Sequence, residues 1–205
     1  RDSSICFVCS HLAAHRDNVS GRNADFANIM ERTIFAPLSA AEAEVKGALE
    51  GRFPHEEASS TSYIVRPLRG HEKLRQQDLT IADHDMIFWL GDLNYRIDEG
   101  VPTQSVFDLI NRKQLVKLAA SDQLTIERAK GTVFSGFEEG PVSSFAPTYK
   151  YAPGTDHYDR RNPGKVRAPA WCDRVLWRCR DQKQQLQSVT LTAYDACDLL
   201  PSDHK

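Results

Sequence analysis

Several features that mark common functional classes are missing from this sequence. No apolar run approaches the roughly 18 residues that a membrane-spanning helix needs, and the first residues lack the pattern of a signal peptide. The net charge is −2, with 26 Lys and Arg against 28 Asp and Glu. No global positive field therefore draws the chain to nucleic acid or to anionic lipid, and any attraction for phosphate must be local.

The chain has few cysteines, and their spacing does not suggest a set of disulfide bonds. Five cysteines, an odd number scattered along the chain, indicate reduced thiols and a cytosolic setting. Cys6 and Cys9 have the C-x-x-C spacing of redox and zinc sites, but residues three apart on a strand face opposite sides, and no second pair completes a zinc site. We interpret both as structural. None of the cysteines is expected in a phosphate-binding loop of the C-x5-R type, which argues against a covalent cysteine mechanism.

The length and composition fit one domain with a substantial core. The chain has 205 residues, of which 40% are hydrophobic and 26% are charged, as is usual in a soluble globular protein. Both ends look cut, because Arg1–Ser4 leads straight into an apolar strand and Lys205 follows a polar pair directly. We therefore expect residues 1–205 to form a partial domain.

Short apolar runs alternate with segments of helical spacing. We predict strands at 5–9, 86–90, 173–178 and near 187–194, and helices at 17–35, after Pro102–Thr103, and at 122–130. Asp17 is the expected cap of the first helix and Gly131 the expected end of the last. Residues 131–170 are rich in Gly, Pro and Ser and should be loops. Strands interleaved with helices indicate an α/β layered domain.

The composition and the spacing of apolar residues change in the stretch 37–80. Ala40–Glu50 has helical potential, while Gly51, Pro54 and Ser59–Ser62 interrupt any regular pattern. We predict a flexible surface insertion here, remote from the chemistry.

Polar side chains stand at the ends of the predicted strands. The unbroken apolar run Met86–Leu90 predicts a strand buried on both faces. Asp92 and Asn94 follow it and, two residues apart, point to the same side. Open α/β proteins place their chemistry at such strand ends. Other polar residues in comparable places are His11, Asp173 and the terminal pair Asp203 and His204.

These residue types favour metal-assisted attack by water. A carboxylate can bind a metal or accept a proton, and an amide can orient water. Asp, Asn and His without a dedicated nucleophile suit hydrolysis with a metal, and Mg²⁺ prefers hard oxygen ligands. Taken alone, however, Asp92 is more often a turn former, and Asp173 could simply pair with Arg174.

Five motifs in order resemble the catalytic domain of the inositol polyphosphate 5-phosphatases, in the branch of the oculocerebrorenal (Lowe syndrome) phosphatase and synaptojanin. They are SHLAAH at 10–15, WLGDLNYRI at 89–97, PTYKY at 147–151, RAPAWCDR at 167–174 and SDHK at 202–205. The resemblance runs from Ile5 to Lys205 and lapses near 37–80. It implies a DNase-I-like sandwich, with two mixed β-sheets packed face to face and helices outside.

The resemblance also implies roles for the polar residues. Asp92 is the candidate general base, Asn94 orients the water, and His204 binds the scissile phosphate while Asp173 fixes its tautomer. Asp203 supports the metal or its water shell, and His11 gives a further hydrogen bond to phosphate. The family's metal-binding Glu would lie upstream of Arg1. Which of Asp92 and His204 is the base stays open. The sequence HLAAH lacks the Glu of H-E-x-x-H, so we interpret His15 as structural.

A cluster of cations is expected to select the substrate. In the family, the positions that match Tyr149, Lys150, Lys165 and Arg167 grip the 4-phosphate of the inositol ring, and Arg96 would contact another phosphate. Without the family context, Lys and Arg in a polar loop are usually just solvated. Ala152–Pro153 stands where relatives usually continue with Asp, which leaves fine substrate preference open.

The sequence thus predicts a Mg²⁺-dependent 5-phosphatase of phosphoinositides, soluble inositol polyphosphates or both. We expect it to be cytoplasmic and peripheral to membranes, with no nucleic-acid partner. Two alternatives remain: a catalytically dead phosphoinositide-binding domain, and another phosphodiesterase of the same fold acting on nucleic acid or sphingomyelin. The net negative charge disfavours a nuclease.

Overall fold

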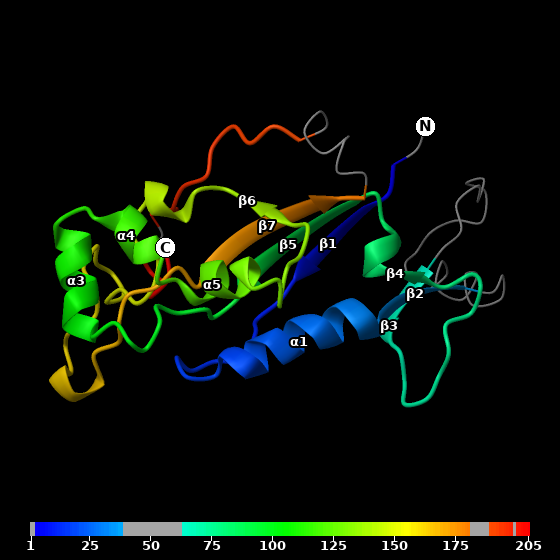
Figure 1. Ribbon diagram of the computed structural model, residues 1–205, viewed down its shortest axis with the longest axis horizontal. Coiled ribbons are helices and arrows are strands. Elements are labelled where there is room, and N and C mark those ends of the chain that lie inside the picture. The colour runs from blue at the N-terminus through cyan, green and yellow to red at the C-terminus, as the bar shows by residue number, and fades with distance from the viewer. Residues whose placement is uncertain (1–2, 39–62, 181–188, 199) are drawn as a thin grey trace. The chain divides into compact units, whose positions relative to one another are not determined.

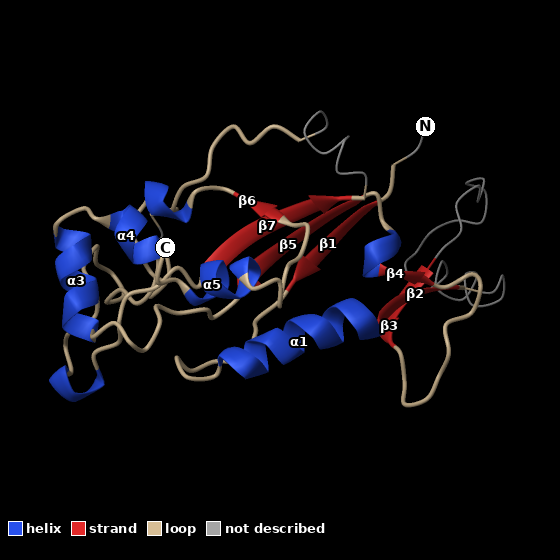
Figure 2. Ribbon diagram, viewed as in Figure 1, coloured by secondary structure: helices blue, strands red, loops and turns tan. Residues whose placement is uncertain are grey.

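The computed structural model describes residues 3–38, 63–180, 189–198 and 200–205. It divides into two compact units, Arg1–Ala27 with Asp85–Lys205, and Asn28–His84. The helices and strands are β1 (Ile5–Cys9), α1 (Val19–Arg32), β2 (Thr33–Pro37), β3 (Tyr63–Pro67), β4 (Leu79–Thr80), β5 (Met86–Asp92), α3 (Thr103–Asn111), α4 (Leu115–Ala119), α5 (Gln123–Ala129), β6 (Glu138–Glu139) and β7 (Asp173–Cys179) (Figures 1 and 2). Within the described ranges, no helix has the length and apolarity to cross a membrane.

The first unit is built on a mixed sheet with the strand order β1-β5-β7-β6. β1 runs parallel to β5, whereas β5 pairs antiparallel with β7. The carboxyl ends of β1 and β5, the start of β7 and the C-terminus therefore meet at one edge (Figure 1). This edge carries most of the polar residues that the sequence singled out.

Only one face of this sheet is fully buried. Ile87 and Trp89 are completely buried, and Trp89 packs against Phe26, Phe134 and Phe137 with ring centroids 5.0–6.4 Å apart. On the other face Phe7 stacks on Phe88 at 5.4 Å and remains 70% exposed. The prediction that the Met86–Leu90 strand is buried on both faces is thus wrong for its Phe88 side. An unbroken apolar run does not reveal which face is covered.

The helices largely follow the predicted pattern. α5 is capped by Asp122, whose carboxylate accepts a hydrogen bond from the Thr125 N–H at 2.9 Å, and the chain turns at Gly131 with a φ of 73°. The cap of α1 is Asn18 and not Asp17, because the Asn18 Oδ1 accepts from the Gly21 N–H. α1 ends at Arg32, since the next five residues pair as strand β2.

The second unit holds an antiparallel sheet with the order β3-β2-β4. Ile34 of β2 stands between Arg66 and Thr80 and is completely buried. The sequence indicated no strand in the stretch that contains β3 and β4, because their residues are polar or isolated from longer apolar runs. The helix predicted at Ala40–Glu50 lies outside the described residues, and the insertion at 37–80 remains a prediction.

No strand is present at 189–194, where the sequence predicted one, and 187–188 lie outside the described residues. The edge of β7 is taken by β6, which pairs Glu138 with Trp177. The segment is anchored through Tyr194 instead, whose hydroxyl accepts from the Val175 N–H and donates to the Glu139 carboxylate at 3.1 Å.

β1 and β5 stay in close contact beyond their paired residues. The Ser10 N–H donates to the Leu90 carbonyl and the Leu12 N–H to the Asp92 carbonyl, both at 3.0 Å. Between these bonds Gly91 has a φ of +127°, and a Cβ there would lie 2.2 Å from the Ser10 carbonyl oxygen. Glycine is therefore required both for backbone conformation and for space.

We expect Gly91→Ala to lower the free energy of unfolding by about 2–6 kcal/mol, because a strained backbone and a forced clash each cost about 1–3 kcal/mol. Urea denaturation measures the loss. Gly131→Ala is the matched control, with a φ of +73° but no atom within 4 Å of the new Cβ, and should cost less. Equal losses would contradict the role of the Ser10 contact.

Candidate active site

The register of the sheet brings two carboxylates together. Asp92, the last residue of β5, stands directly opposite Asp173, the first residue of β7. Paired residues on neighbouring strands project to the same face. Both side chains are partly accessible, with 21% and 35% of their surface exposed.

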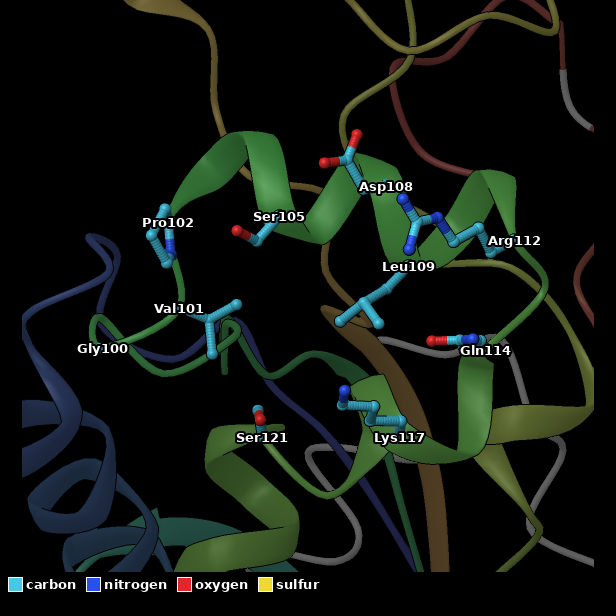
Figure 3. A pocket seen from close by; sticks show the side chains of 10 residues that line it. All are labelled: Gly100, Val101, Pro102, Ser105, Asp108, Leu109, Arg112, Gln114, Lys117 and Ser121. Atoms are coloured by element: carbon cyan, nitrogen blue, oxygen red, sulfur yellow. The ribbon is translucent and has the colours of Figure 1, made fainter.

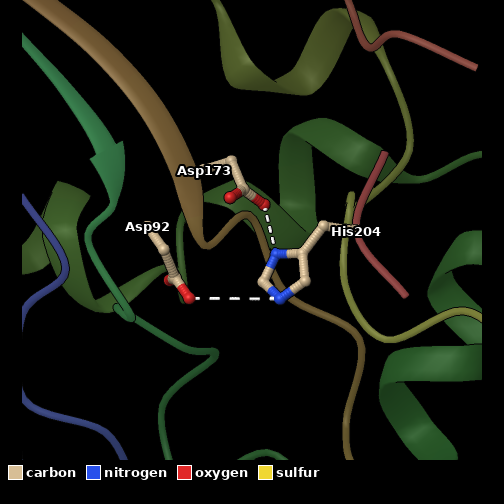
Figure 4. Close-up of side chains that lie close together, drawn as sticks. All are labelled: Asp92, Asp173 and His204. Atoms are coloured by element: carbon tan, nitrogen blue, oxygen red, sulfur yellow. Dashed lines mark hydrogen bonds and ion pairs between the residues drawn. The ribbon is translucent and has the colours of Figure 1, made fainter. Parts of the chain in front are cut away.

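His204 reaches these carboxylates from the C-terminal end of the chain. Its Nδ1 lies 2.8 Å from Asp173 Oδ2, and its Nε2 lies 4.0 Å from Asp92 Oδ2 (Figure 4). The Lys205 N–H donates to the Thr148 carbonyl, and the His204 ring packs on Tyr149 at 4.7 Å. His204, Asp92 and Asp173, far apart in sequence, are thus held in one cluster.

The cluster favours a protonated His204. Its pKa is raised above the ordinary value, first by the hydrogen bond to Asp173 and then by the charges of Asp173, Asp92 and Asp203, which outweigh partial burial. With Nδ1 on Asp173, the Nε2 side faces Asp92 and the open edge of the sheet (Figure 4). His204 can therefore present a positive charge to an anion.

His11 joins the same edge from β1. The backbone bonds around Gly91 place it beside Asp92, with Nε2 of His11 3.5 Å from Asp92 Oδ2. Its side chain is 73% exposed. This position suits a hydrogen bond to a bound anion.

The backbone N–H and both side-chain polar atoms of Asn94 are hydrogen-bonded. It adopts a φ of 56°, a conformation that Asn tolerates, and its N–H donates to Asp92 Oδ1 at 3.0 Å. Its Nδ2 donates to the Leu12 carbonyl at 3.0 Å, while its Oδ1 accepts from Arg96. Asn94 is only 2% exposed, so its first effect is to fix the Asp92 turn.

Arg96, for which the resemblance implied a contact to another phosphate, is buried, and that contact remains a prediction. It bonds to the Asn94 carbonyl and amide oxygens and lies over the Tyr149 ring, 4.4 Å from its centroid. Tyr149 in turn accepts a hydrogen bond from Arg167 Nη1 on its hydroxyl at 2.8 Å. These contacts connect the turn at Asp92–Asn94 to the loop that carries Arg167.

Three of the predicted substrate-binding cations line one cavity, which we name the lysine cavity. It has a volume of about 200 Å³ and is lined by Lys150, Asp159, Asn162, Lys165 and Arg167. Lys165 and Arg167 are exposed, whereas Tyr149 is only 5% exposed and accepts a hydrogen bond from Arg167 on its hydroxyl. The sequence did not single out Asp159 or Asn162, because single polar residues in a polar loop carry no distinguishing pattern.

Asp203 stands apart from the carboxylate cluster. Its Oδ2 lies 3.3 Å from Lys150 Nζ, and its carbonyl accepts from the Tyr151 N–H. The sequence-based assignment of Asp203 to a metal remains a prediction. The sequence also missed Thr148, whose hydroxyl donates to Asp173 at 3.3 Å.

Cys172 and Arg178 do have the C-x5-R spacing, but not in a loop. Arg178 is on β7 and Cys172 directly precedes this strand. Cys172 is completely buried, and burial raises the pKa of its thiol. A buried thiol of this kind is not a nucleophile.

A separate cavity of about 400 Å³ lies between α3 and α4 (Figure 3). Its polar lining includes Asp108, Arg112 and Lys117, and it contains none of the residues that the sequence assigned to chemistry.

The cluster can accommodate a divalent cation. The carboxylates of Asp92 and Asp173 each offer one oxygen, and these oxygens and a ring nitrogen of His204 lie within 4.8 Å of one another. A protonated His204 binds no metal, so the two carboxylates are the candidate ligands. Two carboxylates in a partly open position suit a hard cation that keeps several of its waters.

Comparisons with known proteins agree with this geometry. The family model for Endonuclease/Exonuclease/phosphatase family 2 matches residues 1–205. The chain is 38% identical over 205 residues to the type II inositol 1,4,5-trisphosphate 5-phosphatase of Mus musculus, and 37% identical over 203 residues to the synaptojanin of Caenorhabditis elegans. These alignments cover 100% and 99% of this chain but only 16% and 14% of the relatives.

A solved structure shows the same fold. The inositol polyphosphate 5-phosphatase domain of SPsynaptojanin, in complex with inositol (1,4)-bisphosphate and calcium ion, is 30% identical with a TM-score of 0.67. The match covers 99% of this chain and 45% of that domain. The resemblance and the α/β, DNase-I-like fold class predicted from the sequence are both confirmed, and the chain belongs to Endonuclease/Exonuclease/phosphatase family 2.

Proposed function

We propose that this chain carries the catalytic residues of a Mg²⁺-dependent phosphatase that removes the 5-phosphate from phosphoinositides, soluble inositol polyphosphates or both. The observation that carries the proposal is the Asp92–Asp173–His204 cluster at the sheet edge. The named activities of the mouse and nematode relatives support it.

The cluster supplies both charge and a base. Asp92 Oδ2 has no donor nearer than His11 at 3.5 Å among the described residues, so it is free to accept a proton from water. His204, protonated and oriented by Asp173, neutralises the phosphoryl oxygens. Water loses a proton to Asp92 as it forms the new P–O bond and the bond to the ring oxygen breaks. The ring oxygen takes up a proton from solvent and Asp92 then releases its proton, so the products are inorganic phosphate and a ring hydroxyl.

A divalent cation fits beside these groups. Asp92 and Asp173 would hold it, and because a carboxylate offers two oxygens, Asp92 can still act as a base. When bound, Mg²⁺ would polarise the phosphoryl oxygens as a Lewis acid.

The lysine cavity would hold the neighbouring 4-phosphate. Lys150, Lys165 and Arg167 bring three positive charges to it, and charge-assisted hydrogen bonds to phosphate are among the stronger polar contacts. We also infer that the protein acts in the cytosol at membrane surfaces, which is compatible with five free thiols.

The direct test is phosphate release from short-chain phosphatidylinositol 4,5-bisphosphate with and without Mg²⁺. We expect Mg²⁺-dependent release, and none from phosphatidylinositol 4-phosphate. Asp92→Asn and His204→Gln should each lower the rate about 10²–10⁴-fold, as for positioned acid–base groups. Asp156→Asn, which changes an exposed carboxylate that pairs with His157, should leave the rate unchanged.

Two results would contradict this proposal. A variant at Asp92 or His204 that keeps more than about a tenth of the rate would rule out these roles. A folded protein that binds the lipid without releasing phosphate would be a phosphoinositide-binding domain.

Replacing Asp173 should lower the pKa of His204. In the folded protein this pKa is raised, so the Asp173–His204 pair stabilises the fold below the ordinary histidine pKa, and this stabilisation is lost as pH rises through the raised value. An NMR titration of the His204 ring in Asp173→Asn measures the fall. Asp203→Asn should give a smaller fall, because its charge is the weakest of the named causes. An unchanged pKa in Asp173→Asn would refute the pairing.

Removing two cations of the lysine cavity should change substrate preference. We expect Lys150→Ala with Arg167→Ala to reduce the kcat/KM for phosphatidylinositol 4,5-bisphosphate, relative to the 5-monophosphate, by at least about tenfold. Lys73→Ala with Arg75→Ala removes two exposed cations outside the cavity and should leave the ratio unchanged. The grip on the 4-phosphate is wrong if both double variants rank the substrates alike.

A further inference from the structure

The antiparallel sheet of the second unit has an edge strand, β3, that pairs on one side only among the described residues. The strand order is β3-β2-β4, so β2 is the single neighbour of β3. No residue of β3 belongs to the five motifs that carry the family resemblance. An open sheet edge can accept a further strand, and many proteins bind an extended peptide in this way.

The phase of the pairing with β2 follows from a bond just beyond the strand. The Leu68 N–H donates to the Arg32 carbonyl at 2.6 Å. This bond flanks the pair Thr33–Pro67, which is therefore a pair without hydrogen bonds of its own. Hydrogen-bonded and non-hydrogen-bonded pairs alternate along an antiparallel ladder, so the orientation of every backbone group of β3 is fixed.

The alternation leaves backbone groups on the open edge. Ile64 and Arg66 direct their N–H and carbonyl groups toward β2, whereas those of Tyr63 and Val65 point away from it. In the described ranges no hydrogen bond joins the backbone of Tyr63 or Val65 to another group. Pro67 stands in the same outward series, where its missing N–H costs no bond to β2. Val65 therefore offers both a donor and an acceptor to an added strand.

The same strand exposes apolar side chains. Ile64 is 48% exposed and Val65 is 59% exposed. Successive residues of a strand face opposite sides, so these two side chains lie on opposite faces of the sheet. Val65 stands opposite Phe35, and Ile64 stands opposite the buried Ala36. An added strand would cover apolar surface on both faces as well as pair with the backbone.

The turn after β3 brings positive charge beside the strand. The Glu72 carboxylate accepts from both terminal nitrogens of Arg66, with Nη1 2.8 Å from Oε2, and this pair holds the turn against β3. Three exposed cations of the turn form no ion pair with any described residue: Arg69, Lys73 and Arg75. The edge of the sheet therefore combines unpaired backbone groups with uncompensated positive charge.

These charges decide which occupant suits the edge. A second copy of this chain would bring the same cations to the interface, and charges on edge strands oppose such self-association. A strand with acidic side chains gains from the same cations. A membrane surface meets the cations but offers no row of N–H and carbonyl groups to the backbone of Val65.

We propose that β3 is a docking site for an extended acidic segment of a partner protein, which adds to the sheet as a further strand. Its backbone pairs with Tyr63 and Val65, and its carboxylates meet the cations of the following turn. None of these residues belongs to the Asp92–Asp173–His204 cluster or to the lysine cavity. The second unit would thus recruit a partner and leave the phosphatase chemistry to the first.

The test uses the full chain with a short peptide of alternating Glu and Val, and a control peptide of alternating Lys and Val. In calorimetry the acidic peptide should bind at least about tenfold tighter. Its binding should slow amide hydrogen exchange at Val65 and leave Ile64 and Arg66, already bonded to β2, nearly unchanged. This alternation distinguishes an added strand from contact with side chains alone.

Val65→Pro removes the outward N–H without breaking the sheet. That N–H makes no bond to β2, and proline restricts the preceding residue to the extended conformation that Ile64 already has. We expect the acidic peptide to bind at least about tenfold more weakly, while the amides of β2 keep their exchange protection. Val65→Thr is the matched control, because it keeps the N–H and a branched side chain, and it should bind normally.

Charge reversal tests the acidic character of the partner. Lys73→Glu with Arg75→Glu should remove the preference for the acidic over the basic peptide. Lys113→Glu with Lys117→Glu reverses two exposed cations of the first unit and should leave the preference intact.

Four results would overturn the inference. They are no binding of the acidic peptide at about 1 mM, and binding that Val65→Pro leaves unchanged. A dimer of the free protein that Val65→Pro dissociates would identify a second copy as the occupant. Binding to phosphatidylserine vesicles that charge reversal removes and Val65→Pro does not would identify a membrane.

Discussion

The candidate site depends on the antiparallel register between β5 and β7. This register sets Asp92 opposite Asp173, and a slip of one residue would turn one of them to the other face of the sheet. On that other face Arg174 is completely buried, with Nε 2.6 Å from Glu139 and Nη1 3.0 Å from Asp122. A slip would strip this charge of its partners, which is far more costly than losing a surface ion pair. The buried arginine thus stabilises the register that aligns the two carboxylates of the candidate site.

A second buried group joins the segments around this register. The Gln123 amide oxygen accepts hydrogen bonds from Arg22 Nη2 at 2.7 Å and from the Arg96 N–H at 2.8 Å. The Gln123 amide nitrogen, Nε2, donates to the Arg16 carbonyl. One side chain at the start of α5 therefore connects α1, the β1–α1 loop and the turn after β5. Because Arg96 then contacts Asn94 and Tyr149, the position of the turn at Asp92–Asn94 and that of the cationic loop depend on the same framework.

The side chains of the Asp92–Asp173–His204 cluster could be singled out from the sequence, whereas the framework that brings them together could not. Asp92, Asp173 and His204 could be found because polar residues at the ends of apolar strands stand out, and because they lie within recognisable motifs. Gln123 could not be found, since its role depends on three partners distant in sequence. The burial of Arg96 could not be predicted either, because a sequence does not show which charge will be buried by an aromatic ring and a neighbouring amide. Ile34 fits helical spacing as well as strand alternation, and only pairing with Thr80 decides for the strand.

The charges around the lysine cavity explain how the site can distinguish phosphate-rich ligands. Lys150 is already paired with Asp203 at 3.3 Å, and Asp159 in the same lining is held by Arg161, which keeps the pKa of this carboxyl at about 2. A ligand that enters must compete with Asp203 for Lys150 and tolerate the charge of Asp159. A phosphate with two negative charges can offset this cost, whereas a hydroxyl cannot. Under the proposed function, carboxylates beside the cations would reduce the binding of poorly charged ring positions, and selectivity would arise from competition as much as from attraction.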